Sequence, residues 1–176
     1  ITTADYNVVI GRDAGYDLTT GGSNVLIGYH AGFENVLGTN NVLIGYEAGN
    51  GAAGQDHATN IAIGYQALYT AALDGASGES VLGYQAAYSL TTGDSNTVIG
   101  YQAGNDITTS SQNVLIGHQA AFELVTGGGS NVVIGYAAGK GLAATSDYDY
   151  SVLIGYYAGY DITTGPDNVI IGYKAG

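Results

Sequence analysis

The sequence lacks several features that would point to particular functions. It has no cysteine, one proline, and only three lysine and arginine residues against fifteen acidic ones, which gives a net charge of −12. The missing cysteine excludes disulfide bonds, thiolate metal ligands and a cysteine nucleophile. Nucleic acids and anionic lipids are bound through clustered cations, so we expect neither as a partner.

Long hydrophobic runs are also missing. The longest apolar stretches are far shorter than the ~20 residues that span a bilayer, so we expect no membrane insertion. The chain begins with Ile1 rather than methionine, and we expect it to be a fragment of a longer fibre protein. Glycine is abundant, with 30 residues, but these recur at fixed positions, which a flexible linker would not require.

A single phrase, exemplified by NVLIGYHAG at 24–32 and NVLIGYEAG at 41–49, recurs along the whole chain. Its first glycine is spaced by 17 to 20 residues from one copy to the next. This anchor glycine occupies positions Gly11, Gly28, Gly45, Gly64, Gly83, Gly100, Gly117, Gly135, Gly155 and Gly172. The sequence therefore predicts one repeat domain over residues 1–176, built from ten copies of one unit.

Four alignment columns hold across the ten copies. Isoleucine or leucine precedes the anchor glycine, tyrosine follows it in eight copies, and alanine always stands three residues after it. Asparagine stands four residues before the glycine in eight copies, with Glu79 and Ser151 as exceptions. We expect the asparagines to form a hydrogen-bonded ladder, the tyrosines to stack, and the alanines to mark a place without room for larger side chains.

The unit is too short for a pair of helices, and its valine, isoleucine, tyrosine and threonine residues are typical of strands separated by turns. The predicted fold is therefore all-β: a β-solenoid of about ten coils of 17–20 residues. With about 4.8 Å between stacked strands, the rod would be about 45 Å long.

The Val-Leu-Ile core of the phrase is apolar at three consecutive positions, although strand side chains point to alternate faces. A strand that is buried on both faces has such a continuous run of apolar residues. We expect Val25 and Ile27 to fill the coil and Leu26 to face a neighbouring chain, so that the middle column is covered in a homo-oligomer. This predicted oligomer interface comprises Val9, Leu26, Leu43, Val98, Leu115, Val133, Leu153 and Ile170.

The repeats resemble those of known fibre proteins. NIAIGYQAL at 60–68 and NTVIGYQAG at 96–104 are similar to the NTAIGYQAL-type repeats of phage and cyanobacterial tail-fibre proteins, and more distantly to the YadA-like heads of trimeric autotransporter adhesins. The resemblance implies a left-handed parallel β-roll, a homotrimer of parallel chains, and an extracellular location on a virion fibre or bacterial surface. The units here are longer than those of adhesin heads, and ESVLGYQ at 79–85 departs from the pattern.

No catalytic constellation is evident, so we expect no enzymatic activity and no cofactor. The phrase IGYQAG fits the hexapeptide pattern of β-helix acyltransferases, but once per coil instead of three times. His30 and His118 fall in repeat columns and are interpreted as surface variants rather than as a shared metal site. The acidic residues show no calcium-binding spacing, and adjacent threonines point in opposite directions, which does not suit an ice-binding face.

Candidate recognition residues lie in the longest connections between repeated phrases. These connections combine aromatic and acidic groups, and loops on a rigid scaffold often carry recognition. The candidates are Asp56, His57, Asp147, Tyr148, Asp149 and Tyr150. Inert insertions are the alternative interpretation of the same segments.

The sequence thus favours a structural or adhesive fibre segment whose loops attach to a host or surface. Its expected partners are other copies of the same chain and a glycan or protein receptor. An extracellular filament protein that polymerises end to end is the first alternative. A β-helix enzyme of the acyltransferase type is the second.

Overall fold

Ten short strands form the regular part of the molecule. The computed structural model describes residues 5–51, 58–70, 76–124, 129–141, 149–162 and 165–176, and contains no helix in these ranges. The strands are β1 (Val8–Ile10), β2 (Val25–Ile27), β3 (Val42–Ile44), β4 (Ile61–Ile63), β5 (Ser80–Leu82), β6 (Thr97–Ile99), β7 (Val114–Ile116), β8 (Val132–Ile134), β9 (Val152–Ile154) and β10 (Val169–Ile171).

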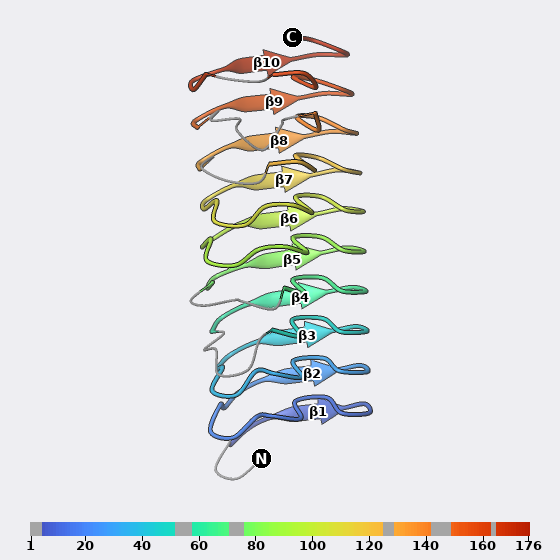
Figure 1. Ribbon diagram of the computed structural model, residues 1–176, viewed down its shortest axis with the longest axis vertical. Coiled ribbons are helices and arrows are strands. Elements are labelled where there is room, and N and C mark those ends of the chain that lie inside the picture. The colour runs from blue at the N-terminus through green and yellow to red at the C-terminus, as the bar shows by residue number, and fades with distance from the viewer. Residues whose placement is uncertain (1–4, 52–57, 71–75, 125–128, 142–148, 163–164) are drawn as a thin grey trace.

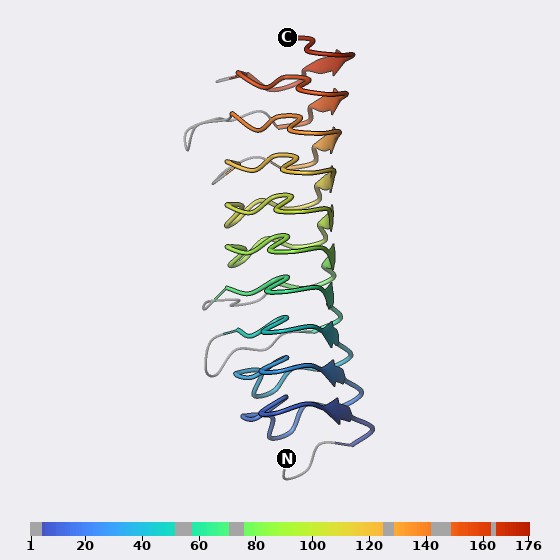
Figure 2. The same cartoon turned by 90° about the vertical axis from the view of Figure 1, so that its right-hand side faces the viewer.

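The strands belong to one parallel sheet whose spatial order is the sequence order, β1 to β10. Equivalent residues pair directly, as Val25 with Val42 and Leu26 with Leu43. Each repeat therefore makes one coil, and the coils stack into a rod with β1 and β10 at opposite ends (Figure 1). Figure 2 shows the strands along one side of the rod and the connecting segments on the other. The predicted all-β parallel solenoid is confirmed.

The middle residue of each strand points into the coil. Leu26, Val98 and Leu115 are fully buried within the single chain, while their strand neighbours are half-buried or exposed. The prediction that the middle column faces a neighbouring chain is therefore wrong. The whole predicted interface belongs to the interior: Leu26, Leu43, Val98, Leu115, Val133 and Leu153 are buried, and Val9 and Ile170 at the two ends pack against the same core.

The second wall of this thin core comes from the segment that follows the anchor glycine. The invariant alanines, such as Ala48 and Ala103, are fully buried there. Farther along the same segment, Leu18, Leu90 and Ile107 are buried in the same cluster. Burial of each leucine contributes about 1.5–3 kcal/mol. The coil is therefore filled by alternating small and large side chains from facing segments, which explains why the alanine position admits nothing larger.

The anchor glycines set the close contact between coils. Gly28 has a φ of +135°, and a Cβ added to it would lie 2.3 Å from the carbonyl oxygen of Gly45. The same collision, at 2.1–2.4 Å, would occur at Gly11, Gly45, Gly64, Gly83, Gly100, Gly117, Gly135 and Gly155. Backbone conformation and lack of space therefore both require glycine at this bend.

The asparagine column forms the predicted ladder, just before the strands. The backbone N–H of Asn41 donates to the side-chain oxygen of Asn24 at 2.9 Å, and the Asn41 amide donates to the same oxygen at 3.1 Å. The Asn24 amide in turn donates to the carbonyl of Gly38 at 2.9 Å. Asn24 and Asn41 are fully buried, so these bonds satisfy polar groups that water cannot reach.

A second ladder runs along the surface, two residues after the anchor glycines. Gln85 donates to Gln66, Gln102 to Gln85 and Gln119 to Gln102, each through Nε2 to Oε1 at 2.9–3.1 Å. The series begins at the carboxylate of Glu47, which accepts from Gln66, and ends at the ammonium of Lys140, which donates to Gln119. Every bond has the same direction, so an acceptor-only group closes one end and a donor-only group the other.

We predict that Asn24→Ala lowers the free energy of unfolding by about 2–3 kcal/mol, because it leaves a buried N–H of Asn41 and the carbonyl of Gly38 without partners. Urea unfolding followed by circular dichroism measures the change. Asn105→Ala is the matched control: Asn105 is half-buried and its amide makes one bond, to the carbonyl of Gln85. Equal losses in the two variants would contradict a special role for the ladder.

Candidate functional site

The outward side of the sheet is an apolar surface that the chain itself leaves uncovered. We call it the outer strand face and define it as the first and third residues of the ten strands together with the residue that follows each anchor glycine. Its most exposed aliphatic members are Val8, Ile10, Ile61, Leu82, Ile99, Val169 and Ile171. Apolar surface arranged in one continuous stripe commonly marks an interaction site.

A continuous stack of aromatic rings borders these aliphatic residues. It comprises Tyr29, Tyr46, Tyr65, Tyr84, Tyr101, His118, Tyr136, Tyr156 and Tyr173, with consecutive ring centroids 4.8–5.2 Å apart. The predicted tyrosine stacking is confirmed. At the first coil, the Arg12 guanidinium lies 5.7 Å from the centre of the Tyr29 ring. Because the rings face one another, the surface they offer consists of ring edges and hydroxyl groups.

The two histidines within the described residues take part in aromatic stacking. His118 occupies the place of a tyrosine, between Tyr101 and Tyr136. His30 stacks on Tyr29 at 3.9 Å and on Phe33 at 4.3 Å. They thus replace residues in the repeat pattern, and within the described ranges no three His, Asp or Glu side chains are grouped as a metal site would need.

The outer strand face is large enough to support association. Nine steps of about 4.8 Å give a length of about 43 Å, and two strand positions plus the aromatic column give a width of about 14 Å. The product, roughly 600 Å², approaches the ~800 Å² that each partner contributes to a typical stable interface. A second rod could therefore cover this face.

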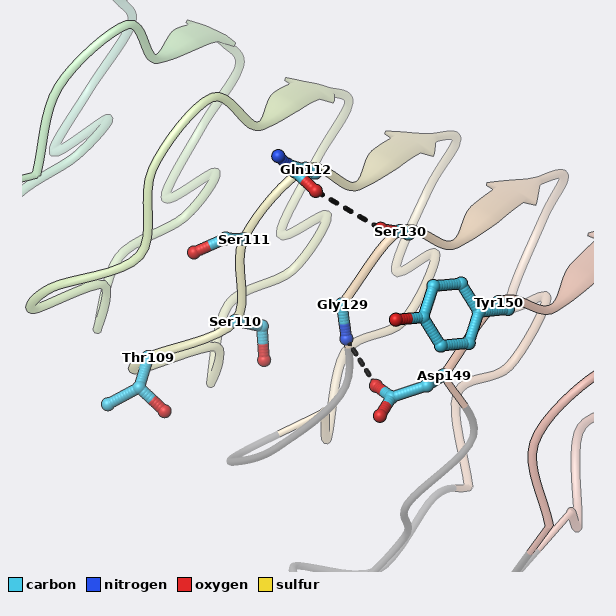
Figure 3. Close-up of a pocket in the computed structure, with 8 residues that line it drawn as sticks. All are labelled: Thr109, Ser110, Ser111, Gln112, Gly129, Ser130, Asp149 and Tyr150. Atoms are coloured by element: carbon cyan, nitrogen blue, oxygen red, sulfur yellow. Dashed lines mark hydrogen bonds between the residues drawn. The ribbon is translucent and has the colours of Figure 1, made fainter.

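A cavity of about 290 Å³ opens elsewhere on the rod, across three consecutive coils. Its lining residues precede β7, β8 and β9, and none belongs to the outer strand face. They are Thr109, Ser110, Ser111, Gln112, Gly129, Ser130, Asp149 and Tyr150 (Figure 3). Six of these side chains carry hydroxyl, amide or carboxylate groups without an aromatic ring, so the cavity is mainly polar.

Hydrogen bonds hold the cavity walls together. The Ser130 hydroxyl donates to the Gln112 side-chain oxygen at 3.2 Å, and the Gly129 N–H donates to one carboxylate oxygen of Asp149 at 2.5 Å (Figure 3). Ser110 differs from these residues. It is only 2% exposed, and its hydroxyl has no hydrogen-bond partner among the described residues.

The candidate recognition residues divide into two groups. Asp149 and Tyr150 line the cavity. Asp56, His57, Asp147 and Tyr148 lie outside the described residues. The sequence-based prediction did not include the other side of the cavity, although Ser110 carried a signal: it stands where five other repeats have glycine, at Gly21, Gly38, Gly93, Gly128 and Gly165.

Neither the family-model search nor the searches of curated proteins and solved structures finds a match to this chain. The described part of the chain also has no helix of the length and apolar character needed to cross a bilayer. Inferences about function therefore depend on the residues and geometry described above.

One acidic side chain lies inside the asparagine ladder. Glu79 is 1% exposed, and its carboxylate accepts hydrogen bonds from the backbone N–H and the side-chain amide of Asn96 at 3.1–3.3 Å. Burial raises its pKa to about 8, and the nearby Asp94 charge adds to this effect, while the bonds from Asn96 act in the opposite direction. The fold therefore favours the protonated form of Glu79.

We predict that Glu79→Asn, which restores the ladder residue, removes a pH-dependent loss of stability. In the wild type, Glu79 binds its proton more tightly when folded than when unfolded. The contribution of Glu79 to the free energy of unfolding is therefore most favourable below its unfolded pKa of about 4.5. This contribution is lost progressively as the pH rises toward about 8. Urea unfolding from about pH 5 to about pH 8 should show the variant gaining several kcal/mol relative to the wild type, since each pKa unit corresponds to about 1.4 kcal/mol.

Glu79→Gln is the control for side-chain length, because it removes the charge and keeps the shape. We expect it to lose the same pH dependence. If the stability of the wild type and of both variants changed in parallel across this range, the buried carboxyl would not be the cause.

Proposed function

We propose that the chain is a structural segment of a fibre, a rigid rod that associates side by side with copies of itself. The observation that carries this proposal is the outer strand face, which offers aliphatic side chains along all ten coils and tyrosine side chains in eight of them. A parallel β-solenoid is compatible with a structural repeat protein, because in-register ladders and a continuous core favour rigidity over conformational change. The proposal includes no enzymatic activity.

The finer features of the proposal come from the sequence resemblance. Similarity to tail-fibre and trimeric adhesin repeats favours a left-handed roll, a homotrimer with parallel chains, and an extracellular location on a virion fibre or bacterial surface. Three parallel rods could each cover part of their neighbours' outer strand faces around a common axis, which is a closed arrangement of identical surfaces. Attachment to a host or surface would then use groups away from this axis.

We predict that Ile61→Lys combined with Ile99→Lys converts the oligomer to a monomer of 17.8 kDa, because both side chains are exposed on the outer strand face and neither contributes to the interior. A desolvated lysine without a partner would strongly disfavour association. Light scattering coupled to size-exclusion chromatography measures the mass, and circular dichroism checks that the fold is retained.

Leu37→Lys is the matched control, because Leu37 is similarly exposed but lies outside the outer strand face. It should leave the oligomer intact. A wild-type protein that stays monomeric at high micromolar concentration would refute self-association. Filaments of single-rod width in electron micrographs would instead favour end-to-end polymerisation.

A further inference from the structure

The polar cavity that precedes β7, β8 and β9 is accessible independently of the outer strand face. Its walls come from the same register in three successive coils: Gln112, Ser130 and Tyr150 are equivalent positions of the repeat, five residues before the anchor glycine. Stacking therefore brings three different side chains together where a perfect repeat would place three identical ones. The cavity therefore lies where the repeat is irregular, and these non-identical side chains determine which groups a ligand would meet.

The charges around the cavity restrict what it can bind. Among the described residues that line the cavity, Asp149 is the only charged one, and none is a lysine or arginine. An anion would be repelled by this carboxylate and would find no cation among these residues. A divalent cation needs several oxygen ligands, usually with more than one carboxylate, and one Asp149 oxygen already accepts from the Gly129 N–H. A neutral ligand is compatible with these restrictions.

The polar groups at the cavity suit a ligand with several hydroxyl groups. The second carboxylate oxygen of Asp149 can accept from a ligand hydroxyl, and the Nε2 of Gln112 can donate to one.

Tyr150 provides the apolar part of the site. Its side chain stands at the edge of the cavity, and Figure 3 shows the ring face-on, with the hydroxyl pointing toward the side of Gly129. The residue is 66% exposed, and no described aromatic ring stacks on it. The stacked tyrosines of the outer strand face offer only edges, whereas Tyr150 offers an open ring face.

We propose that this cavity binds one neutral pyranose unit of a carbohydrate, with a C–H face of the sugar on the Tyr150 ring and sugar hydroxyls on Asp149 and Gln112. The volume of about 290 Å³ accommodates a single sugar ring and its hydroxyl groups. A polar site with one aromatic platform and no cation matches the amphipathic, uncharged character of such a ring. This site extends the proposed structural function, and its existence does not depend on the oligomeric state.

The test uses the intact chain and a panel of methyl glycosides of glucose, galactose, mannose and N-acetylglucosamine. Saturation-transfer difference NMR detects binding, which we expect in the millimolar range for so small a ligand. Tyr150→Ser should weaken binding about tenfold or more, through loss of the stacking surface. Serine occupies the same register at Ser23, Ser95 and Ser130, so this substitution should not disturb folding.

Tyr6→Ser is the matched control. Tyr6 occupies the same register in the first coil and is exposed, but does not line the cavity. It should leave binding unchanged.

A neutral trisaccharide that contains this sugar at its end distinguishes a free monosaccharide from a glycan terminus. Saturation confined to the terminal unit would support a glycan end as the ligand, and binding of the methyl glycoside alone would support a free sugar. Absence of transfer to every glycoside at millimolar concentration would overturn the proposal. Transfer that Tyr150→Ser leaves at the wild-type level would also overturn it.

Discussion

The contact between successive anchor glycines is the constraint on which the rest of the structure depends. At this bend the backbones of adjacent coils approach so closely that an added Cβ at Gly28 would lie 2.3 Å from the Gly45 carbonyl oxygen. This contact fixes the spacing of the coils at one edge of every strand. The buried amides, the aromatic rings and the surface glutamines can each meet their own copies only because that spacing is the same from coil to coil.

A structure built on identical neighbours is sensitive to any residue that breaks a column. Glu79 keeps the ladder bonds to Asn96 but introduces a carboxyl where the other coils have neutral groups. Asn35 stands where Leu18 and Leu90 fill the core in other coils, and its buried amide has no partner among the described residues. Ser110 is a third case, with a buried hydroxyl in a column of mainly glycine. Two of these departures lower stability without an evident gain, and the third borders the cavity.

Much of the fold could be predicted from sequence because every coil repeats the same requirements. The spacing of the anchor glycines, the asparagine ladder and the tyrosine stack all follow from aligning ten copies. The sequence did not show which side chains of each strand point into the coil. In an apolar run such as Val25-Leu26-Ile27, either the middle residue or its two neighbours could be the buried ones. The structure resolves it by placing the alanine segment opposite the middle residue, so that Leu26 is buried and Ile27 is partly exposed.

The cavity could be predicted only in part. Asp149 and Tyr150 attracted attention as an aromatic and acidic pair, but their counterparts lie some 20 and 40 residues earlier in the chain, around Ser130 and Ser110–Gln112. Only stacking brings these segments together. A single repeat contains no more than one wall of such a site, so inspection of the repeats one at a time does not reveal it.

The one-directional bonding of the surface glutamines has a consequence for the length of the rod. Between Glu47 and Lys140, each glutamine both donates and accepts, so an additional coil with glutamine at this position would fit between any two others and leave no group unpaired. The charged ends, by contrast, cannot be duplicated without placing an acceptor against an acceptor or a donor against a donor. Coils could therefore be added to the rod, by gene duplication or by design, between the coil of Glu47 and the coil of Lys140.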